Sequence, residues 1–224
     1  MPVFTPHLSI LPPAQRRLWA ELSITPDQFT LYGGTALALR LGHRTSVDFD
    51  FFSNEPFDPD RLAATLPYLR NAERVQVEPN TLTCRVERGG PVLLSFFGAL
   101  NLGQIVPPDT VEGPGFQVAS LQDIAGTKVA VIQKRAEVKD YLDIDVLVQN
   151  GINLGTALAA GRAVHGRSFN PLITLKALSY FDDVPALPQS VRDRLATAVA
   201  AVDLTRIPEL TAYLPRRENS GGEP

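Results

Sequence analysis

Five consecutive residues, 47–51, alternate strictly between apolar and acidic side chains. Successive side chains of a β-strand point to opposite faces, so a strand here would carry Asp48 and Asp50 on one face. The opposite face is apolar and is expected to pack on the core; it consists of Val47, Phe49 and Phe51. The pattern therefore predicts a half-buried strand that carries a pair of carboxylates.

Four more runs of apolar, β-branched or aromatic residues predict further strands. They cover residues 29–32, 74–77, 81–87 and 92–97. The last two are joined by Arg88-Gly89-Gly90-Pro91, which is typical of a hairpin turn, so antiparallel strands are expected after the strand with the two aspartates. Residues 98–117 are rich in Gly and Pro and are expected to form a connection with one short strand near 104–106.

Apolar residues at intervals of three and four predict the helices. The predicted helices cover residues 14–23, 35–41, 61–69, 121–134, 138–148, 154–164, 171–181 and 191–201. In the first of them Trp19 is expected on the buried face, because an amphipathic helix uses Trp for the core far more often than for stacking on a base.

Strands dominate the first half of the chain and helices the second, which predicts an α/β (α+β) fold. Residues 1–117 are expected to form a core domain that begins with a proline-rich, extended arm at 1–13. Residues 118–214 are expected to form a helical C-terminal portion. The polar segment 215–224, which ends Ser-Gly-Gly-Glu-Pro, is predicted to be disordered.

Composition narrows the class of protein. Of the 224 residues, 44% are hydrophobic and 20% are charged, which is ordinary for a globular protein, and no apolar run is long enough to cross a bilayer. No signal peptide is expected, because the N-terminus lacks a basic region followed by an apolar stretch, and a cytoplasmic location is predicted. Cys84 is the only cysteine, which excludes an intrachain disulfide and a cysteine-rich zinc site.

The net charge of −3 argues against a broadly basic surface for nucleic acid, although a local cluster of Arg and Lys could still bind RNA.

A double glycine, Gly33-Gly34, lies between the strand predicted at 29–32 and the helix predicted at 35–41. Backbone donors at such a turn can hold phosphate. Two carboxylates on one strand face repel each other unless a cation lies between them, and oxygen ligands of this kind suit Mg²⁺ or Mn²⁺ better than zinc. A phosphate-holding turn beside a divalent-metal pair indicates nucleotide chemistry.

These motifs, Tyr32-Gly33-Gly34 and then Asp48-Phe49-Asp50-Phe51, resemble those of the polymerase-β-type nucleotidyltransferase superfamily. Within that superfamily, four motifs in one order are similar to the AbiEii/AbiGii toxin family. They are Gly33-Gly34-Thr35-Ala36-Leu37, residues 44–50, residues 121–128, and Arg135 with Lys139-Asp140-x-x-Asp143. The resemblance covers about residues 32–143. It implies a nucleotidyltransferase fold with a mixed central sheet and an active site in the cleft between the sheet and the helical portion.

The resemblance also implies a role for each matching residue. The nucleotide-binding residues would be Gly33, Gly34, Thr35, Arg44, Ser46, Arg135 and Lys139. The catalytic residues would be Asp48, Asp50, Lys128, Asp140 and Asp143. Asp48 and Asp50 would bind Mg²⁺ or Mn²⁺, and Lys128 would neutralise phosphate charge. One of the two aspartates in 139–143 would activate the acceptor or bind the nucleotide.

Alternatives stay open for several of these residues. The cluster 139–143 is also compatible with an exposed, ion-paired helix face, and Arg135 is equally compatible with a capping or salt-bridge role. Enzymes of the superfamily often carry a third carboxylate on a later strand, where this chain offers only Ser95, with Glu87 as a weak substitute. His43 is expected in a solvent-facing loop.

The resemblance implies the toxin of a toxin–antitoxin pair, which transfers a nucleoside monophosphate from a nucleoside triphosphate (NTP) to an acceptor hydroxyl. RNA, and tRNA in particular, is the expected acceptor, and a cognate antitoxin protein is an expected partner. Two alternatives are a nucleotidyltransferase that modifies a small molecule, such as an antibiotic, and an inactive nucleotide-binding protein. No membrane partner is expected.

Overall fold

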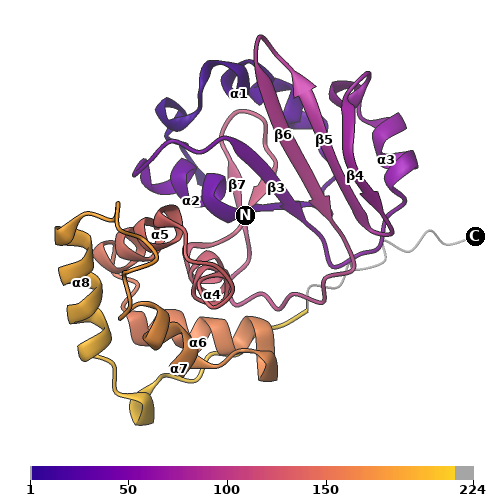
Figure 1. Cartoon of the computed structure of the whole chain (residues 1–224). Coiled ribbons are helices and arrows are strands. Elements are labelled where there is room, and N and C mark those ends of the chain that lie inside the picture. Colours follow the sequence, from indigo (N-terminus) through magenta and orange to yellow (C-terminus); the bar gives the residue numbers. More distant parts are fainter. Residues whose placement is uncertain (1, 215–224) are drawn as a thin grey trace, which may run out of the picture.

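The computed structural model describes residues 2–214, and these contain an eight-stranded mixed β-sheet with helices packed on it (Figure 1). The strands are β1 (Val3–Phe4), β2 (Thr30–Tyr32), β3 (Asp48–Phe52), β4 (Glu73–Glu78), β5 (Thr81–Glu87), β6 (Pro91–Phe97), β7 (Asp109–Val111) and β8 (Gln117–Val118). Their order across the sheet is β1-β7-β8-β2-β3-β6-β5-β4. The mixed central sheet expected from the resemblance is therefore confirmed.

Strand β3 lies in the middle of this sheet, antiparallel to β2 and parallel to β6. In this register Asp50 lies opposite Tyr32 on one side and Ser95 on the other. The hairpin β5–β6 and the antiparallel pair β4–β5 follow as predicted. All six residues of β4 are exposed at the end of the sheet, and its register with β5 shifts between Arg74 and Gln76.

The alternation predicted for β3 holds within the strand. Phe49 and Phe51 are fully buried, and Asp48 and Asp50 lie on the other face, partly accessible. The expectation that Val47 belongs to the core is wrong, since its side chain is 48% exposed. The strand begins only at Asp48, so Val47 precedes the ladder, where its carbonyl oxygen accepts a hydrogen bond of 2.8 Å from Gln15 Nε2.

Eight α-helices surround the sheet in the described part of the chain. They are α1 (Pro13–Leu18), α2 (Gly33–Leu41), α3 (Pro59–Thr65), α4 (Leu121–Val131), α5 (Val138–Gln149), α6 (Leu154–His165), α7 (Pro171–Ala177) and α8 (Gln189–Ala200). Short 3-10 helices cover Leu8–Ile10, Trp19–Ile24, Pro67–Leu69, Gly166–Ser168 and Leu204–Arg206. Figure 1 shows α4 to α8 gathered as one group beside the strands.

Four predicted helices are shorter than expected, and the one predicted at 121–134 ends at Val131. The one predicted at 61–69 ends at Thr65, because the residue before a proline avoids helical geometry and Leu66, before Pro67, is extended. The one predicted at 14–23 is α1 followed by a 3-10 helix, and the one predicted at 171–181 ends at Ala177.

The connection 98–117 differs from its prediction more than the helices do. No strand forms at 104–106, where Gln104 makes only a single bridge to Tyr213. The strands of this region are β7 and β8, which pair with each other and lie parallel to β1 and β2 respectively. Elements of two or three residues carry too little periodicity to be recognised in a sequence.

Close packing of α4 on α6 holds the helical group together. A Cβ atom on Gly126 would lie only 2.9 Å from the carbonyl carbon of Ala160, so the two helices approach to backbone contact. Helix α4 also contacts α2 and α5. This packing fixes the orientation of α4, the helix that carries Lys128, relative to the turn at the start of α2.

The structure also bears on the expectations for Trp19 and for membrane-spanning helices. Trp19 is buried and its ring meets that of Phe116 edge-on with centroids 5.4 Å apart, which confirms it as a core residue. Among the described helices, none is both long and apolar enough to cross a membrane. The division into 1–117 and 118–214 stays a prediction, and the tail predicted at 215–224 lies outside the described residues.

Candidate active site

Gly33 and Gly34 form the turn at the start of α2, directly after β2. Gly33 has a φ angle of +74°, and a Cβ atom on it would lie 2.8 Å from Asp50 Oδ2. A Cβ atom on Gly34 would overlap the guanidinium group of Arg44. The two glycines thus let the N-terminus of α2, with its free backbone N–H groups, lie directly against a carboxylate and a cation of the site.

Thr35 and Ser46 hold the two motifs together. The hydroxyl of Thr35 is hydrogen-bonded to Ser46 Oγ at 2.8 Å and to the backbone carbonyl oxygen of Asp48. Both side chains are buried or nearly so. These bonds connect the first turn of α2 to the segment that enters β3, so the phosphate-holding turn and the aspartates are fixed side by side.

Asp50 is the aspartate of β3 that lies against Gly33. Burial raises its pKa, and so does the negative charge of Asp48, whereas the charge of Lys128 and a hydrogen bond from Ser95 lower it. A cation bound between Asp48 and Asp50 would favour the charged form of both carboxylates.

The pair fits Mg²⁺ or Mn²⁺. No group of three or more His, Cys, Asp or Glu side chains that could hold a metal exists among residues 2–214, so Asp48 and Asp50 would hold it without a third carboxylate. Magnesium is commonly bound by one or two carboxylates together with substrate phosphates and water, which is the donor set available here. Ser95, opposite Asp50, occupies the position expected for a third carboxylate.

Asp140 and Asp143 lie one turn apart on α5 and are completely buried. Lys128 Nζ lies 2.6 Å from Asp143 Oδ2 and 3.4 Å from Asp140 Oδ1. Arg44 binds both oxygens of Asp143, at 2.7 and 2.9 Å, and Arg135 binds both oxygens of Asp140, at 2.8 and 3.2 Å. The alternative of an exposed, ion-paired helix face at 139–143 is therefore wrong for the two aspartates.

His43 also belongs to this network, and the expectation that it faces solvent is wrong. Its side chain is 9% exposed and its Nε2 lies 2.8 Å from Asp143 Oδ1. Gly42, in the left-handed conformation that ends α2, turns the chain so that His43 points toward α5. Burial alone would raise the pKa of Asp143, but hydrogen bonds from His43 and Arg44 and the charge of Lys128 hold it well below its usual value.

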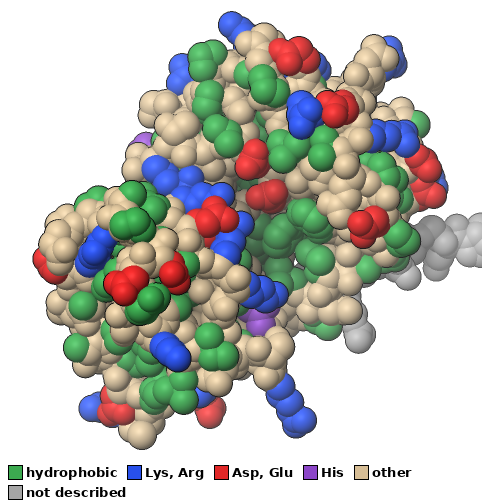
Figure 2. Space-filling model, in the orientation of Figure 1, with side chains coloured by type: hydrophobic (Ala, Val, Ile, Leu, Met, Phe, Trp, Pro, Cys, Tyr) green, Lys and Arg blue, Asp and Glu red, His purple; other side chains and the backbone are tan. Residues whose placement is uncertain are grey.

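Nine of the residues expected in the site line one cleft of about 490 Å³: Gly34, Thr35, Arg44, Ser46, Asp48, Asp50, Lys128, Arg135 and Lys139. Gly33 lines an adjoining hollow, and Asp140 and Asp143 lie behind the cations. Figure 2 shows basic and acidic side chains facing each other across the hollow between the helical group and the sheet. Four cations, two carboxylates on one strand face and a helix N-terminus thus meet in one place, an arrangement suited to a polyphosphate and a divalent cation.

A model of the family described as "Nucleotidyl transferase AbiEii toxin, Type IV TA system" matches residues 17–214. The chain belongs to the AbiEii family. The resemblance is thereby confirmed: this AbiEii member is a nucleotidyltransferase toxin of a type IV toxin–antitoxin system.

This AbiEii chain is also similar to individual proteins. It is 30% identical over 160 residues to an uncharacterized protein of Aquifex aeolicus (strain VF5), a match that covers 70% of this chain and 75% of the relative. Its fold is similar to that of MenT4, a nucleotidyltransferase toxin from Mycobacterium tuberculosis H37Rv, with a TM-score of 0.60 and 17% identity over 86% of this chain and 83% of that chain. A protein from H. pylori gives a TM-score of 0.54 with 16% identity over 84% and 90%. These similarities confirm the expected fold class.

The AbiEii cleft continues into a hollow of about 320 Å³ on the side of Phe52. Gly34, Asp50, Lys128 and Arg135 line both. The far wall of this hollow comes from helices and loops distant in the chain, and its members include Leu102, Val131, His165 and Phe169. Sequence reasoning missed these residues. Only Phe52 could have been found, because the period of two that pairs Asp48 with Asp50 also places Phe52 on their face.

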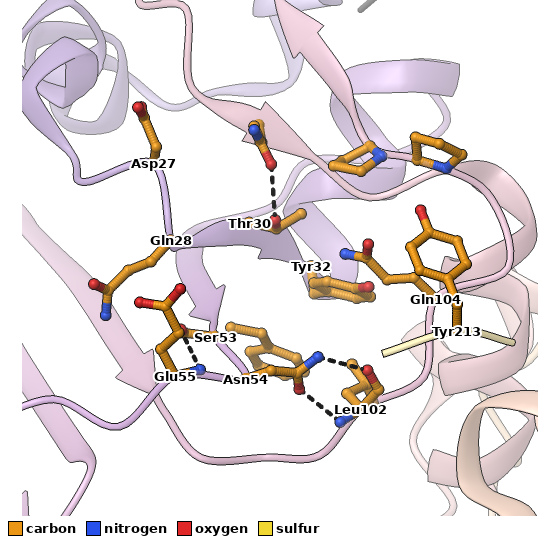
Figure 3. Close-up of a pocket in the computed structure, with 14 residues that line it drawn as sticks. Asp27, Gln28, Thr30, Tyr32, Ser53, Asn54, Glu55, Leu102, Gln104 and Tyr213 are labelled. Atoms are coloured by element: carbon orange, nitrogen blue, oxygen red, sulfur yellow. Dashed lines mark hydrogen bonds between the residues drawn. The ribbon is translucent and has the colours of Figure 1, made fainter. Parts of the chain in front are cut away.

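A third hollow, of about 350 Å³, lies beyond Phe52 and Leu102, which line it as well (Figure 3). Amide and aromatic side chains surround it, and Tyr32 stacks on Phe52 with ring centroids 5.0 Å apart. Both ends of the Asn54 side chain bond the backbone of Leu102, which fastens the 98–108 loop here. Within the described part of the chain no Lys or Arg lines this hollow, and Asp27 and Glu55 do, so it does not suit phosphate.

Proposed function

We propose that this AbiEii toxin transfers a nucleoside monophosphate from an NTP to a hydroxyl group of RNA, with tRNA as the expected acceptor, in a reaction that depends on Mg²⁺ or Mn²⁺. The observation that carries the proposal is the convergence, in one cleft, of the α2 N-terminus, four basic side chains and the carboxylates of Asp48 and Asp50. We also propose a cytoplasmic location and control by a cognate antitoxin.

The basic residues have the place and charge to hold the triphosphate. Arg44, Lys128, Arg135 and Lys139 all line the cleft, and backbone N–H groups at the start of α2 add donors for a phosphate oxygen. In the transfer, a bond forms between the acceptor oxygen and the α-phosphorus while the bond to the β-phosphate oxygen breaks. Pyrophosphate leaves, and the proton of the acceptor hydroxyl passes to water. The cations offset the negative charge that develops on the leaving pyrophosphate.

Asp48 and Asp50 would hold the divalent cation. When bound, it would withdraw charge from phosphate oxygens at the α-phosphorus. The raised pKa of Asp50, caused by burial and by Asp48, is the expected property of a carboxylate pair arranged for a cation. We propose that two carboxylates suffice, with Ser95 as a hydrogen-bond donor to Asp50 in place of a third.

Asp140 and Asp143 are better suited to positioning cations than to activating the acceptor. Both are inaccessible, and every carboxylate oxygen already accepts from Lys128, Arg44, Arg135 or His43. A general base must reach the proton that it removes, which a buried and fully paired carboxylate cannot do. We therefore propose that the two aspartates hold Arg44, Lys128 and Arg135 in the geometry that binds phosphate.

A polymer acceptor requires an open approach to the reacting centre. Asp48 lines the cleft and also an open hollow of about 560 Å³ at the start of β3, which Arg85 and Gln15 border. An acceptor hydroxyl can reach the carboxylates through this hollow without crossing the phosphate-binding cations. This open side favours RNA over a small molecule that would be enclosed.

The test uses each of the four α-labelled NTPs with Mg²⁺ and total RNA, purified tRNA, or a panel of antibiotics. We expect label on RNA with the wild type and no label with Asp50→Asn. Asp60→Asn, which changes an exposed aspartate on α3, is the matched control and is expected to label like the wild type. Label on an antibiotic but not on RNA would show that the acceptor is a small molecule. Absence of transfer with every acceptor would refute the proposal.

A further inference from the structure

Four hollows follow one another along β3, and the strand residues that line them give their order. Asp48 borders the open hollow at the strand's start, Asp48 and Asp50 border the phosphate cleft, and Asp50 and Phe52 border the 320 Å³ hollow. Phe52 then borders the hollow of Figure 3. Asp50 and Phe52 are two strand residues apart, about 7 Å. A triphosphate in the central cleft therefore has the open hollow on one side and the 320 Å³ hollow on the other.

The 320 Å³ hollow differs chemically from the phosphate cleft. Its lining includes five apolar side chains, Phe52, Leu102, Ala130, Val131 and Phe169, beside polar ones such as Thr127, Gln133, Lys134 and Ser168. Its volume falls at the lower end of the range for small-molecule sites, about 300–1,000 Å³. A flat, uncharged group suits such a wall, and in an NTP that group is the base.

His165 is the polar residue of this hollow whose bonding is incomplete. The ring lines the hollow, but its Nε2 is buried without any hydrogen-bond partner among the residues that the structure describes, so a group bound in the hollow would meet the ring at Nδ1. Burial lowers the pKa of His165, as does the charge of Lys134, so the ring is neutral near pH 7. A neutral imidazole can donate at one nitrogen and accept at the other, as the edge of a base requires.

Phe169 shapes the same hollow from the loop after α6. A Cβ atom on Gly161 would lie 2.7 Å from Phe169 Cζ, so the absence of a side chain at 161 lets the ring lie against α6. Phe169 and His165 are therefore both positioned by α6, whereas Phe52, the other aromatic residue of the hollow, belongs to β3.

We propose that the hollow between Phe52 and Phe169 binds the base of the NTP, and that His165 determines which base is preferred through a hydrogen bond to its edge. This inference rests on the proposed function, since it takes the triphosphate to lie in the cleft at Asp48 and Asp50. His165 is then a specificity-determining residue that contacts no phosphate.

The test compares the binding of tripolyphosphate and of the four NTPs to the wild type, His165→Phe and His7→Phe. Tripolyphosphate has no base, so its affinity reports the phosphate cleft alone. We expect one NTP to bind the wild type best. His165→Phe, which keeps a flat ring, should reduce this preference by about 2- to 10-fold, the value of one hydrogen bond, and leave tripolyphosphate unchanged. His7→Phe, the same change at an exposed site outside the hollow, should leave both unchanged.

A second variant fills the hollow without touching histidine. Ala130 lines it from α4 and is only partly buried. Ala130→Leu should therefore lower the affinity for every NTP toward the affinity for tripolyphosphate. The variant should unfold at the wild-type temperature. Equal binding of NTPs and tripolyphosphate to the wild type would overturn the base site. An unchanged preference in His165→Phe would overturn the role of His165. A wild type that binds neither tripolyphosphate nor NTP would instead refute the proposed function.

Discussion

The Oδ2 atom of Asp50 lies 2.8 Å from the point where a side chain on Gly33 would begin. The carboxylate of β3 and the turn before α2 are thus in direct contact, although 16 residues separate them in the chain (50 − 33 − 1 = 16). The contact is possible only with a hydrogen atom at position 33. It joins the expected phosphate-holding turn to the expected metal-binding strand.

Gly33→Ala is expected to disturb the site in two ways, through its φ angle of +74° and through the collision with Asp50. We expect a loss of stability of about 1 kcal/mol or more and a loss of at least tenfold in transfer activity. Gly115→Ala is the matched control, because Gly115 has a φ angle of +80° and a Cβ atom on it would meet no atom of the described residues within 4 Å. It should show the backbone cost alone, by urea unfolding, and retain activity. Equal activity losses in both variants would contradict the role of the contact.

Asp143→Asn is expected to destabilise the fold strongly. The change leaves Arg44, Lys128 and His43 facing a neutral group in a buried setting, and breaking a buried pair by removing one partner typically costs about 3–5 kcal/mol. Asp145→Asn, on the same helix, is the control, because the side chain of its partner Arg194 is 43% exposed to solvent. Urea unfolding should show a clearly smaller loss for the control. If Asp143→Asn lost no more stability than Asp145→Asn, the buried network would not be a stabilising element.

Acid should weaken the wild type partly through Asp143. Its pKa in the folded state lies below the value of about 3.9 in the unfolded chain, so the unfolded state binds the proton more readily. The stabilisation is complete above about pH 5 and is lost progressively as the pH falls through 3.9 toward the folded pKa. Free energies of unfolding measured between pH 7 and pH 3 should therefore fall less steeply for Asp143→Asn than for the wild type. Parallel slopes would contradict the cause assigned here.

Asp50→Asn is expected to have the opposite effect on stability. The folded-state pKa of Asp50 is raised by burial and by Asp48, so the charged carboxylate costs stability at neutral pH, and this cost disappears as the pH falls below the unfolded value. The variant should thus unfold at a higher temperature than the wild type at pH 7 while losing transfer activity. Addition of Mg²⁺ should raise the unfolding temperature of the wild type and leave that of Asp50→Asn nearly unchanged. An equal rise in unfolding temperature for both proteins would show that Asp50 does not bind the cation.

Local patterns in the sequence predicted the elements that build the site. The period of two in 48–51 located both aspartates on one face, and the double glycine located the turn before α2. Spacing on α5 predicted that Asp140 and Asp143 share a face, but not that this face is buried against Arg44 and Lys128. Burial depends on which element packs above a helix, and spacing within one helix carries no such information.

The residues that sequence reasoning missed depend on long-range packing. His43 reaches Asp143 because Gly42 reverses the chain, and the two are separated by 99 intervening residues (143 − 43 − 1 = 99). His165 and Phe169 reach the hollow only because Gly126 allows α6 to approach α4 closely. A single glycine on a helix carries no local sign of the partner that it will touch.

The exposed strand β4 bears on how the protein behaves at high concentration. A strand that ends a sheet can pair with the same strand of another molecule and start aggregation, and Val75 and Val77, each nearly half exposed, would favour such pairing. Two features oppose it: the shift in register between Arg74 and Gln76, which bends the edge, and the glutamates at both ends of the strand, which would meet like charges in an antiparallel or parallel copy. The register shift and the terminal glutamates of β4 thus both disfavour edge-to-edge pairing of separate copies.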